Sequence, residues 1–322
     1  MEGLIAVSVV VASHARPLRL RWLLNALEEQ TLARGTWDLV VVHDYDSPTA
    51  DRIIDGHPLS RTGVLHQIAI PNGTGSPSRQ RNLGWRSAAG ELIVFTDDDC
   101  RPEPDWLERL VATAREVPGG IVQGATRPDP LECAVLSAPH VRTMSIDPVG
   151  PYAQTCNILY PRELLERLGG FDERAIAGED VGLALRARAA GLRVSGAADA
   201  VVNHAVESHT LVGILRQNLK WRHLAYLVKR HPELRHELPL RVFWDFDHLW
   251  MTVALAGVLG ARHRPALIGL VAPYALRSAG RRGGGRGARA VALIEMPGQA
   301  ARQLAEVLGL AMGSLRHRTF LL

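Results

Sequence analysis

Three consecutive aspartates, Asp97, Asp98 and Asp99, carry the strongest chemical signal in the sequence, and they directly follow the β-rich segment 92–96. A buried strand that ends in carboxylates presents them at the edge of an α/β sheet where ligands bind. Packed carboxylates repel one another and raise each other's pKa values unless a cation lies among them. Because such ligands are all oxygens, the expected cation is Mg²⁺ or Mn²⁺. The alternative for this segment alone is an acidic turn in solvent.

A second acidic pair, Glu179-Asp180, opens a stretch with apolar residues at helical spacing. Carboxylates in the first turn of a helix are stabilised by the helix dipole, so capping is the simplest interpretation of this pair alone. The segment 168–173, Leu-Gly-Gly-Phe-Asp-Glu, stands just upstream. The presence of this segment next to Glu179-Asp180 favours a chemical role for the pair over helix capping alone.

Strand-like and helix-like segments alternate through the first two thirds of the chain. The predicted strands are 5–11, 38–42, 64–70 and 91–96, and the predicted helices begin at Pro17 and cover 80–88 and 106–115. This order predicts a mostly parallel sheet flanked by helices, with ligands at the carboxyl ends of the strands. From residue 162 the pattern is mainly helical, with strand-like pieces at 193–195 and 200–202.

The composition is that of a globular protein. The chain has 322 residues, of which 47% are hydrophobic and 22% charged, enough for one large α/β domain and an appendage. Its three cysteines have no CxxC spacing, which argues against a disulfide framework or a zinc site and predicts a reducing compartment. The first apolar run has no basic residue before it, so we expect a strand rather than a signal peptide and a cytoplasmic location.

Charge is divided unevenly along the chain. Residues 211–322 have 17 Lys/Arg and 6 Asp/Glu, a net of +11, whereas residues 1–210 have 20 and 27, a net of −7. A basic region on an acidic body predicts an anionic partner. Nucleic acid is disfavoured as that partner, because the arginines are interleaved with aliphatic runs and no reading motif is present.

The basic region is predicted to be helical, with a long helix over 211–231 and a basic loop at Gly283-Gly284-Gly285. Its apolar runs, 249–259 and 266–275, are shorter than the roughly 18–20 residues that span a bilayer. They are long enough to lie in a membrane interface, so attachment to the anionic inner face of a membrane is one interpretation. A helical hairpin packed on protein is the other.

Taken in order, these segments resemble the family 2 inverting glycosyltransferases, whose donor domain has the GT-A fold. The resemblance rests on 7–17, Asp44, 81–84 (Arg-Asn-Leu-Gly), Asp97 and Asp99, Asn157, 169–172 (Gly-Gly-Phe-Asp), Glu179-Asp180 and Asn203-His204. Two positions depart from the family pattern. His43 stands where a first aspartate is common, and Tyr45-Asp46 replaces a common Gly-Ser.

The resemblance implies a GT-A catalytic domain over 1–210, with a donor half at about 1–100 and an acceptor half at about 101–210, followed by the basic region 211–322. It implies metal-dependent transfer of a sugar from a nucleoside-diphosphate donor to a hydroxyl acceptor, a cell-envelope glycan or a lipid-linked molecule. A UDP-sugar is favoured as donor and a GDP-sugar is the alternative. No oligomeric state follows from the sequence.

Each candidate residue has a role by the same resemblance. Asp180 would be the base that takes the acceptor's proton, with Glu179 beside it, and direct attack would invert the anomeric centre. The metal, which neutralises the leaving diphosphate, would be held by Asp99, Asp97 and His204. Asp44 would contact the nucleotide base and Asp98 the ribose. The residues in contact with the donor would be Ser13, His14, Arg16, Asp44, Arg81, Asp97, Asp98 and Asn157.

Two other classes of protein remain as alternatives. A phosphatase of the haloacid-dehalogenase type also places paired aspartates after a strand, but it needs a lysine before its later acidic motif, and Lys220 and Lys229 both follow Asp180. A GT-A domain that binds a nucleotide sugar or a partner without transfer is the second. The intact Asp97, Asp99 and Asp180 argue against it.

Overall fold

The computed structural model describes residues 6–138, 140–280 and 286–322, without the side chains of 286–293. The predicted loop Gly283-Gly284-Gly285 lies outside the described residues. The chain divides into two compact units, Met1–Ser208 and His209–Leu322.

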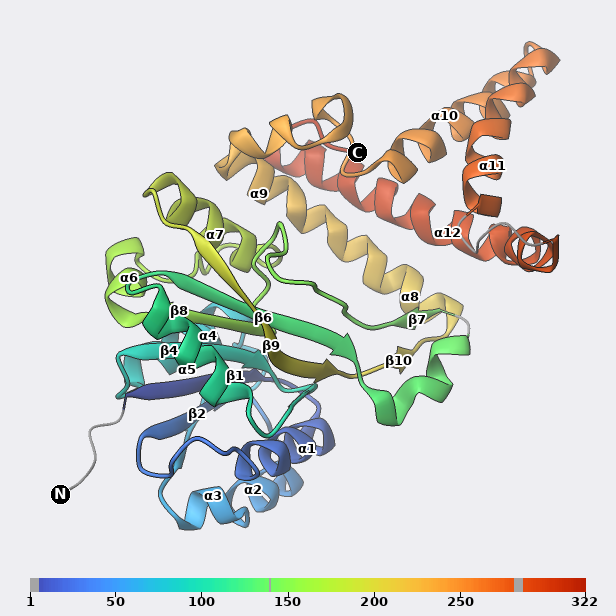
Figure 1. Ribbon diagram of the computed structural model, residues 1–322. Coiled ribbons are helices and arrows are strands. Elements are labelled where there is room, and N and C mark those ends of the chain that lie inside the picture. Colours follow the sequence, from blue (N-terminus) through green and yellow to red (C-terminus); the bar gives the residue numbers. More distant parts are fainter. Residues whose placement is uncertain (1–5, 139, 281–285) are drawn as a thin grey trace. The chain divides into compact units, whose positions relative to one another are not determined.

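An eight-stranded sheet, with the order β3-β2-β1-β4-β8-β6-β9-β5, forms the centre of the first unit (Figure 1). β1 to β4 are parallel to one another, whereas β8 runs antiparallel to both of its neighbours, β4 and β6. The strands are β1 (Val7–Ser13), β2 (Trp37–His43), β3 (Leu65–Ala69), β4 (Leu92–Asp97), β5 (Cys100–Pro102), β6 (Ile121–Pro128), β8 (Asn157–Pro161) and β9 (Val194–His204). The expected α/β fold is confirmed, and the antiparallel β8 makes the sheet a mixed one.

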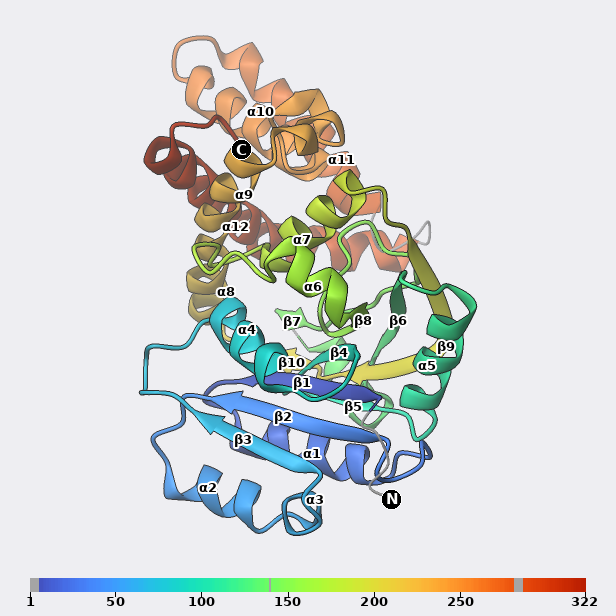
Figure 2. The same cartoon turned by 90° about the vertical axis from the view of Figure 1, so that its left-hand side faces the viewer.

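Helices cover both faces of this sheet. Val9 and Val11 of β1 belong to the apolar cluster that includes α1 and α5, whereas Val10 belongs to the cluster with α4, α6 and α7. Figure 2 shows α1, α2 and α3 on one side of β1, β2 and β3, and α4 on the other. The helices are α1 (Pro17–Glu28), α2 (Pro48–Asp55), α3 (Pro58–Arg61), α4 (Pro77–Ser87), α5 (Trp106–Glu116), α6 (Arg162–Leu168) and α7 (Glu179–Ala189). Because both faces are covered, β1, β2 and β4 are almost continuously apolar.

Two small elements lie beside the main sheet. The 3₁₀ helix η1 (Pro130–Ser137) follows β6, and β7 (Val141–Arg142) pairs with β10 (Glu207–Ser208) in a separate antiparallel ribbon. The pieces predicted at 193–195 and 200–202 are one strand, β9, which pairs with β6 across an irregularity between Gly124 and Ala125.

The second unit is helical. Its elements are α8 (Leu211–Asn218), η2 (Leu219–His223), α9 (Leu224–Arg230), η3 (Pro232–His236), η4 (Pro239–Arg241), α10 (Phe246–Ala261), η5 (Pro265–Val271), α11 (Ala272–Gly280) and α12 (Arg286–His317). The helix predicted over 211–231 is found as the contiguous run α8, η2 and α9, whose middle segment is a 3₁₀ helix rather than an α-helix. At this segment α12 approaches so closely that a Cβ on Gly313 would lie 2.1 Å from the carbonyl oxygen of Arg222.

A buried polar network joins three elements of the second unit. His248 of α10 is fully buried, and its Nε2 lies 3.1 Å from Glu306 of α12. The other carboxylate oxygen of Glu306 accepts a hydrogen bond from the Asn218 amide of α8, at 2.8 Å. Among the helices that the structure describes, none has the length and apolar character to cross a membrane.

Asn157 holds the centre of the sheet together. Its amide nitrogen donates to the carbonyl oxygens of Ala125 and Ala200, at 2.7 and 2.9 Å, and its oxygen accepts from the Trp106 indole at 2.8 Å. One side chain thus links β8 to β6, β9 and α5. Gly124 leaves it room, because a Cβ there would lie 2.4 Å from the Asn157 amide.

We expect Asn157→Ala to destabilise the protein by about 3 kcal/mol or more, because it leaves three buried polar groups without partners. This loss corresponds to a fall in Tm of about 5–10 °C for a domain of this size. Thermal melting with Asn72→Ala as the control, an exposed asparagine on the loop before α4, measures the difference. Equal melting of the two variants would contradict the bridging role.

Candidate active site

Asp97, Asp98 and Asp99, which we call the acidic run, lie where the strand order of the sheet reverses. β1 has β2 on one side and β4 on the other, which makes the crevice at their carboxyl ends the preferred ligand site of an open α/β sheet. β4 delivers Asp97, Asp98 and Asp99 to this edge, β1 delivers Ser13 and the turn after it, and β2 delivers Asp44. The register of these strands therefore brings the carboxyl ends of β1, β2 and β4 to the same edge of the sheet.

Asp98 is held inside the edge, with an exposed fraction of 1%. One of its oxygens accepts hydrogen bonds from the Ser13 hydroxyl at 2.6 Å and the His14 backbone N–H at 3.2 Å. The other lies 2.7 Å from the Arg16 guanidinium. Burial raises the pKa of Asp98 to about 7, although Arg16 lowers it. Asp98 therefore shapes the turn after β1, and it offers almost no surface to the ribose contact expected of it.

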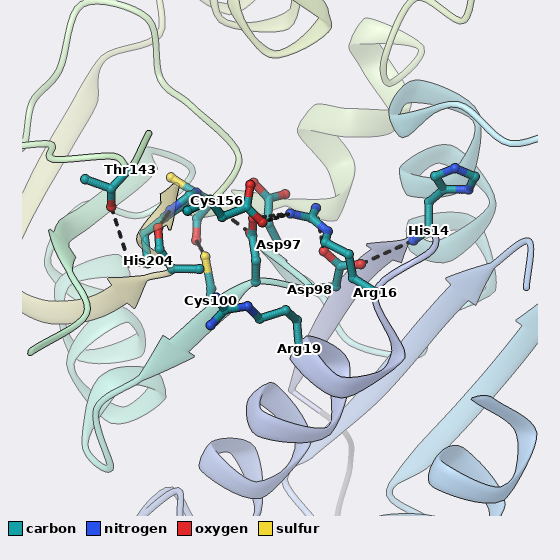
Figure 3. A network of polar contacts seen from close by, with 12 residues as sticks. His14, Arg16, Arg19, Asp97, Asp98, Cys100, Thr143, Cys156 and His204 are labelled. Carbon is teal, nitrogen blue, oxygen red and sulfur yellow. Dashed lines mark hydrogen bonds and ion pairs between the residues drawn. The ribbon is translucent and has the colours of Figure 1, made fainter. Parts of the chain in front are cut away.

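Arg16 forms ion pairs with several carboxylates at once. Its Nη1 contacts Oδ2 of Asp99 and lies 3.6 Å from Glu207 of β10, while Nη2 holds Asp98. Burial lowers the pKa of Arg16, but these carboxylates raise it above its usual range. Arg16 therefore orients the carboxylates of Asp98 and Asp99. Its side chain is 40% exposed, and its contact with the donor stays a prediction. Figure 3 shows it reaching from the β1 turn toward Asp98.

Asp99 and His204 lie together at the end of β9. The His204 Nε2 is 3.7 Å from Oδ1 of Asp99, the oxygen that does not contact Arg16. The His204 Nδ1 lies 2.9 Å from the carbonyl oxygen of Ala205. A carbonyl can only accept, so Nδ1 carries a hydrogen, and Nε2 is the ring nitrogen that faces Asp99. A hydrogen bond from one ring nitrogen to a backbone carbonyl is also how metal-binding histidines are oriented.

Cys100 lies close to this pair, and the ligand atoms of Asp99, Cys100 and His204 fall within 4.8 Å of one another. Burial raises the pKa of the Cys100 thiol well above its usual value, and the thiol points to the carbonyl oxygen of Cys156 at 3.8 Å. All three cysteines are free. The donor set that fits a divalent cation is therefore Asp99 Oδ1 and His204 Nε2.

Arg81 connects the acidic run to the second acidic pair. This buried side chain of α4 donates to Asp97 at 2.8 Å and to Glu179 at 2.6 Å. Its guanidinium thus fixes the end of β4 against the start of α7. Asp97 keeps a quarter of its side chain exposed, so it remains able to meet a ligand, whereas Arg81 is enclosed.

Asp180 lies at the first turn of α7, beside Glu179. Its Oδ1 accepts from the Val181 backbone N–H at 2.8 Å, and the residue before the helix is Gly178, which supplies no side-chain cap. Burial, together with the neighbouring Glu179 carboxylate, raises the pKa of Asp180 well above the ordinary value, although Arg81 opposes the shift. A carboxylate with a raised pKa suits proton transfer near neutral pH.

Asp44 forms the floor of a polar corner at the end of β2. It is 3% exposed and lies 2.6 Å from Nδ1 of His14, whose own side chain is 65% exposed. A Cβ on Gly75, in the loop before α4, would lie 2.9 Å from Asp44. The neighbouring Tyr45 hydroxyl hydrogen bonds the Ser13 hydroxyl at 2.6 Å. This corner has the carboxylate and the exposed imidazole that a nucleotide base could meet.

The structure encloses one candidate, Asn157, beside Thr96 in the sheet, and it adds two residues that the sequence does not single out as contacts. Asn157 is 1% exposed and its hydrogen-bonding atoms are all engaged in the sheet, so its role is structural. Glu207 and Tyr45 join the site through Arg16 and Ser13. Their only signals in the sequence are their positions, three residues after His204 and one after Asp44.

Known proteins with similar sequences include glycosyltransferases and an O-antigen biosynthesis protein. The chain is 25% identical over 204 residues to Glycosyltransferase AglE of Haloferax volcanii, which covers 62% of this chain and 66% of the relative. It is 29% identical over 221 residues to the O-antigen biosynthesis protein RfbC of Myxococcus xanthus, and the match covers 60% of this chain and 17% of RfbC. The Pre-mycofactocin glycosyltransferase of Mycobacterium tuberculosis is 29% identical over 213 residues, covering 61% and 43%. The chain thus spans less than two thirds of the length of each relative.

Solved structures share the fold. The mannosyltransferase PcManGT from Pyrobaculum calidifontis, in complex with GDP-Man and Mn²⁺, superposes with a TM-score of 0.59 at 18% identity, over 97% of this chain and 86% of that one. TarS 1–349 of S. aureus in complex with UDP superposes with a TM-score of 0.52 at 17% identity, over 98% of this chain and 92% of that one. These likenesses confirm the GT-A type α/β fold.

Two family models match the chain. Glycosyl transferase family group 2 matches residues 92–276. Glycosyl transferase family 2 matches residues 8–169, which is half of the chain and includes the opening strand, Arg81 and the acidic run. The chain therefore belongs to glycosyltransferase family 2.

Proposed function

We propose that this protein transfers a sugar from a nucleoside-diphosphate donor to a hydroxyl acceptor, with a divalent cation held by Asp99 and His204. The observation that carries the proposal is the pair of Asp99 Oδ1 and His204 Nε2, 3.7 Å apart beside the acidic run. A cation in this place supplies the positive charge that a leaving diphosphate requires. Asp97, with part of its side chain exposed, is the third candidate ligand.

The chain's own residues would act as follows. Asp180 takes the proton of the acceptor hydroxyl as that oxygen attacks the anomeric carbon, and a single displacement inverts the configuration. Arg81 positions Glu179 next to this base and Asp97 next to the donor, through its two hydrogen bonds. Arg16 holds Asp98 and Asp99 in place. His14 and Asp44 receive the base of the nucleotide.

Support for the donor and metal classes comes from the solved structures of similar fold. PcManGT was solved with GDP-Man and Mn²⁺, and TarS with UDP and with UDP-GlcNAc. The proposed donor is therefore a UDP-sugar or, as the second choice, a GDP-sugar. The proposed cation is Mn²⁺ or, as the second choice, Mg²⁺. A domain that binds a nucleotide sugar without transfer is the rival function, and the raised pKa of Asp180 favours the enzyme.

The proposal includes an acceptor and a location. We infer a glycan or lipid-linked acceptor of the cell envelope, and a cytoplasmic protein attached peripherally to the inner face of the membrane. The charge of the region 211–322, a net of +11, supports this attachment. Arginines near an anionic lipid surface each contribute about 1 kcal/mol to binding.

The first prediction concerns the cation. We expect UDP or GDP to raise the Tm only with Mn²⁺ or Mg²⁺ present, by several degrees at saturation, because a ligand at about 100 times its Kd adds about 2.7 kcal/mol. His204→Ala should weaken Mn²⁺ binding by about tenfold or more. Thermal shift with UDP, GDP and dTDP, each with and without metal, measures both effects and ranks the bases. His66→Ala, an exposed histidine of β3, is the control; equal shifts without metal would remove the cation from the proposal.

The second prediction concerns the base. Asp180→Asn keeps the shape and the local hydrogen bond but cannot accept a proton, so transfer should fall by about 10²–10⁴ while donor binding survives. Asp51→Asn removes a carboxylate from the first turn of α2 and controls for the helix dipole. Transfer rates and donor thermal shifts are compared for both variants. Near-normal transfer by Asp180→Asn would place the base elsewhere.

The third prediction concerns pH. Only the ionised Asp180 can accept a proton, and its pKa is raised. We therefore expect kcat to increase with pH, with an apparent pKa for this acidic limb well above the ordinary carboxyl value of about 4. The limb should disappear in the residual activity of Asp180→Asn. A kcat profile at saturating donor and metal tests this, and a limb that persists unchanged in the variant would belong to another group.

A further inference from the structure

One end of the second unit exposes aliphatic and cationic side chains together. We call residues 258–270, which comprise the end of α10, the connecting turn and η5, the hairpin tip. Val258, Leu259 and Ile268 are 53%, 57% and 54% exposed. Arg262, His263 and Arg264 form the turn and are exposed as well. Figure 1 shows the far end of α10 at the top right, above α11 and α12.

The hairpin is closed on its inner side, so its outer side chains have no core to enter. A Cβ on Gly257 would lie 2.7 Å from the carbonyl oxygen of Leu267, and one on Gly260 would lie 2.7 Å from the Leu267 side chain. These two glycines let η5 pack directly on α10. The residues that α10 buries are His248, Met251, Ala254 and Gly257, all before the hairpin tip.

The sequence on both sides of the hairpin tip carries charge of a single sign. No acidic residue stands between Asp247 and Glu295, whereas seven arginines do. Asp247 is already paired with Arg277, at 2.5 Å. Arg262 donates to His263, and within the described residues neither Arg262 nor Arg264 contacts a carboxylate. Two guanidinium groups thus face solvent next to exposed aliphatic side chains.

We propose that the hairpin tip docks on an anionic lipid bilayer, with Leu259 and Ile268 entering the boundary between headgroups and acyl chains and Arg262 and Arg264 binding lipid phosphates. This inference rests on the membrane attachment proposed above and assigns its place. Apolar side chains next to arginines are the composition of elements that lie in a membrane interface. The guanidinium fork matches phosphate oxygens.

A bilayer fits better than the other anionic partners. Nucleic acid would leave the aliphatic side chains without an apolar environment, and the hairpin tip has no Phe, Tyr or Trp on which a base could stack. A protein partner would need carboxylates opposite two arginines and an apolar pocket between them. A lipid surface supplies both a plane of phosphates and an apolar layer beneath it.

The test is flotation of the full chain with vesicles of phosphatidylcholine, with and without phosphatidylglycerol. We expect binding to need phosphatidylglycerol and to weaken with salt. Arg262→Gln/Arg264→Gln should lower the partition coefficient by about thirtyfold, which follows from the contribution of each arginine near anionic lipid. Leu259→Ser/Ile268→Ser should lower it by about tenfold or more. Hydrogen exchange of 258–270 should slow on vesicles.

The matched control is Arg115→Gln/Arg167→Gln, which removes the same charge from two exposed positions of the first unit and should bind vesicles as the unchanged chain does. The Tm shift caused by nucleotide should be the same in every variant. Loss of nucleotide binding would therefore count against the proposed donor site, and loss of vesicle binding alone concerns the hairpin tip. Equal binding to neutral vesicles, no binding to either kind, or equal loss in both arginine pairs would each overturn the proposal. Protection of 258–270 by self-association without lipid would overturn it too.

Discussion

Repulsion between the carboxylates that gather at the carboxyl end of β4 is the constraint around which the first unit is built. Asp97, Asp98 and Asp99 leave one strand together, and Glu179 and Glu207 approach them from α7 and β10. Removing charges from water is costly unless each is paired. Arg16 pairs with Asp98 and Asp99, and Arg81 pairs with Asp97. Each arginine connects elements that are far apart in sequence. The oxygen of Asp99 that faces His204 is the one at which the proposed cation would bind.

The scaffold behind this edge keeps the carboxylates in register. The parallel half of the sheet, β3 to β4, brings the ends of β1, β2 and β4 to one crevice, as the pairing of Ala12 with Asp97 shows. The other half brings His204, at the end of β9, to Asp99. Asn157 connects β8 to β6 and β9, so the position of His204 depends on a side chain that touches no ligand.

The sequence predicts one half of this architecture better than the other, for a physical reason. Strands covered on both faces are continuous apolar runs, so β1, β2 and β4 were within about two residues of their predicted bounds. β6 and β8 carry buried Gln123, Thr126 and Asn157, whose partners lie elsewhere in the chain, and no local pattern reveals them. Likewise, motif order predicts that Asp99, His204, Arg81 and Asp180 share a site, but the pairing of Arg16 with Asp98 is a long-range contact that spacing does not encode.

The close approach of Gly313 to Arg222 has a consequence for how the second unit folds. α8, η2 and α9 have α12 as their main packing partner, about ninety residues further along the chain, and Leu322 exchanges backbone hydrogen bonds with Val242 and Trp244. Contacts of such sequence separation form late, because the loop must close before they can stabilise anything. During synthesis the first helices of the unit therefore wait, with an uncovered apolar face, until residues 309–322 have emerged. A chain truncated before Gly309 would keep this apolar face exposed to solvent.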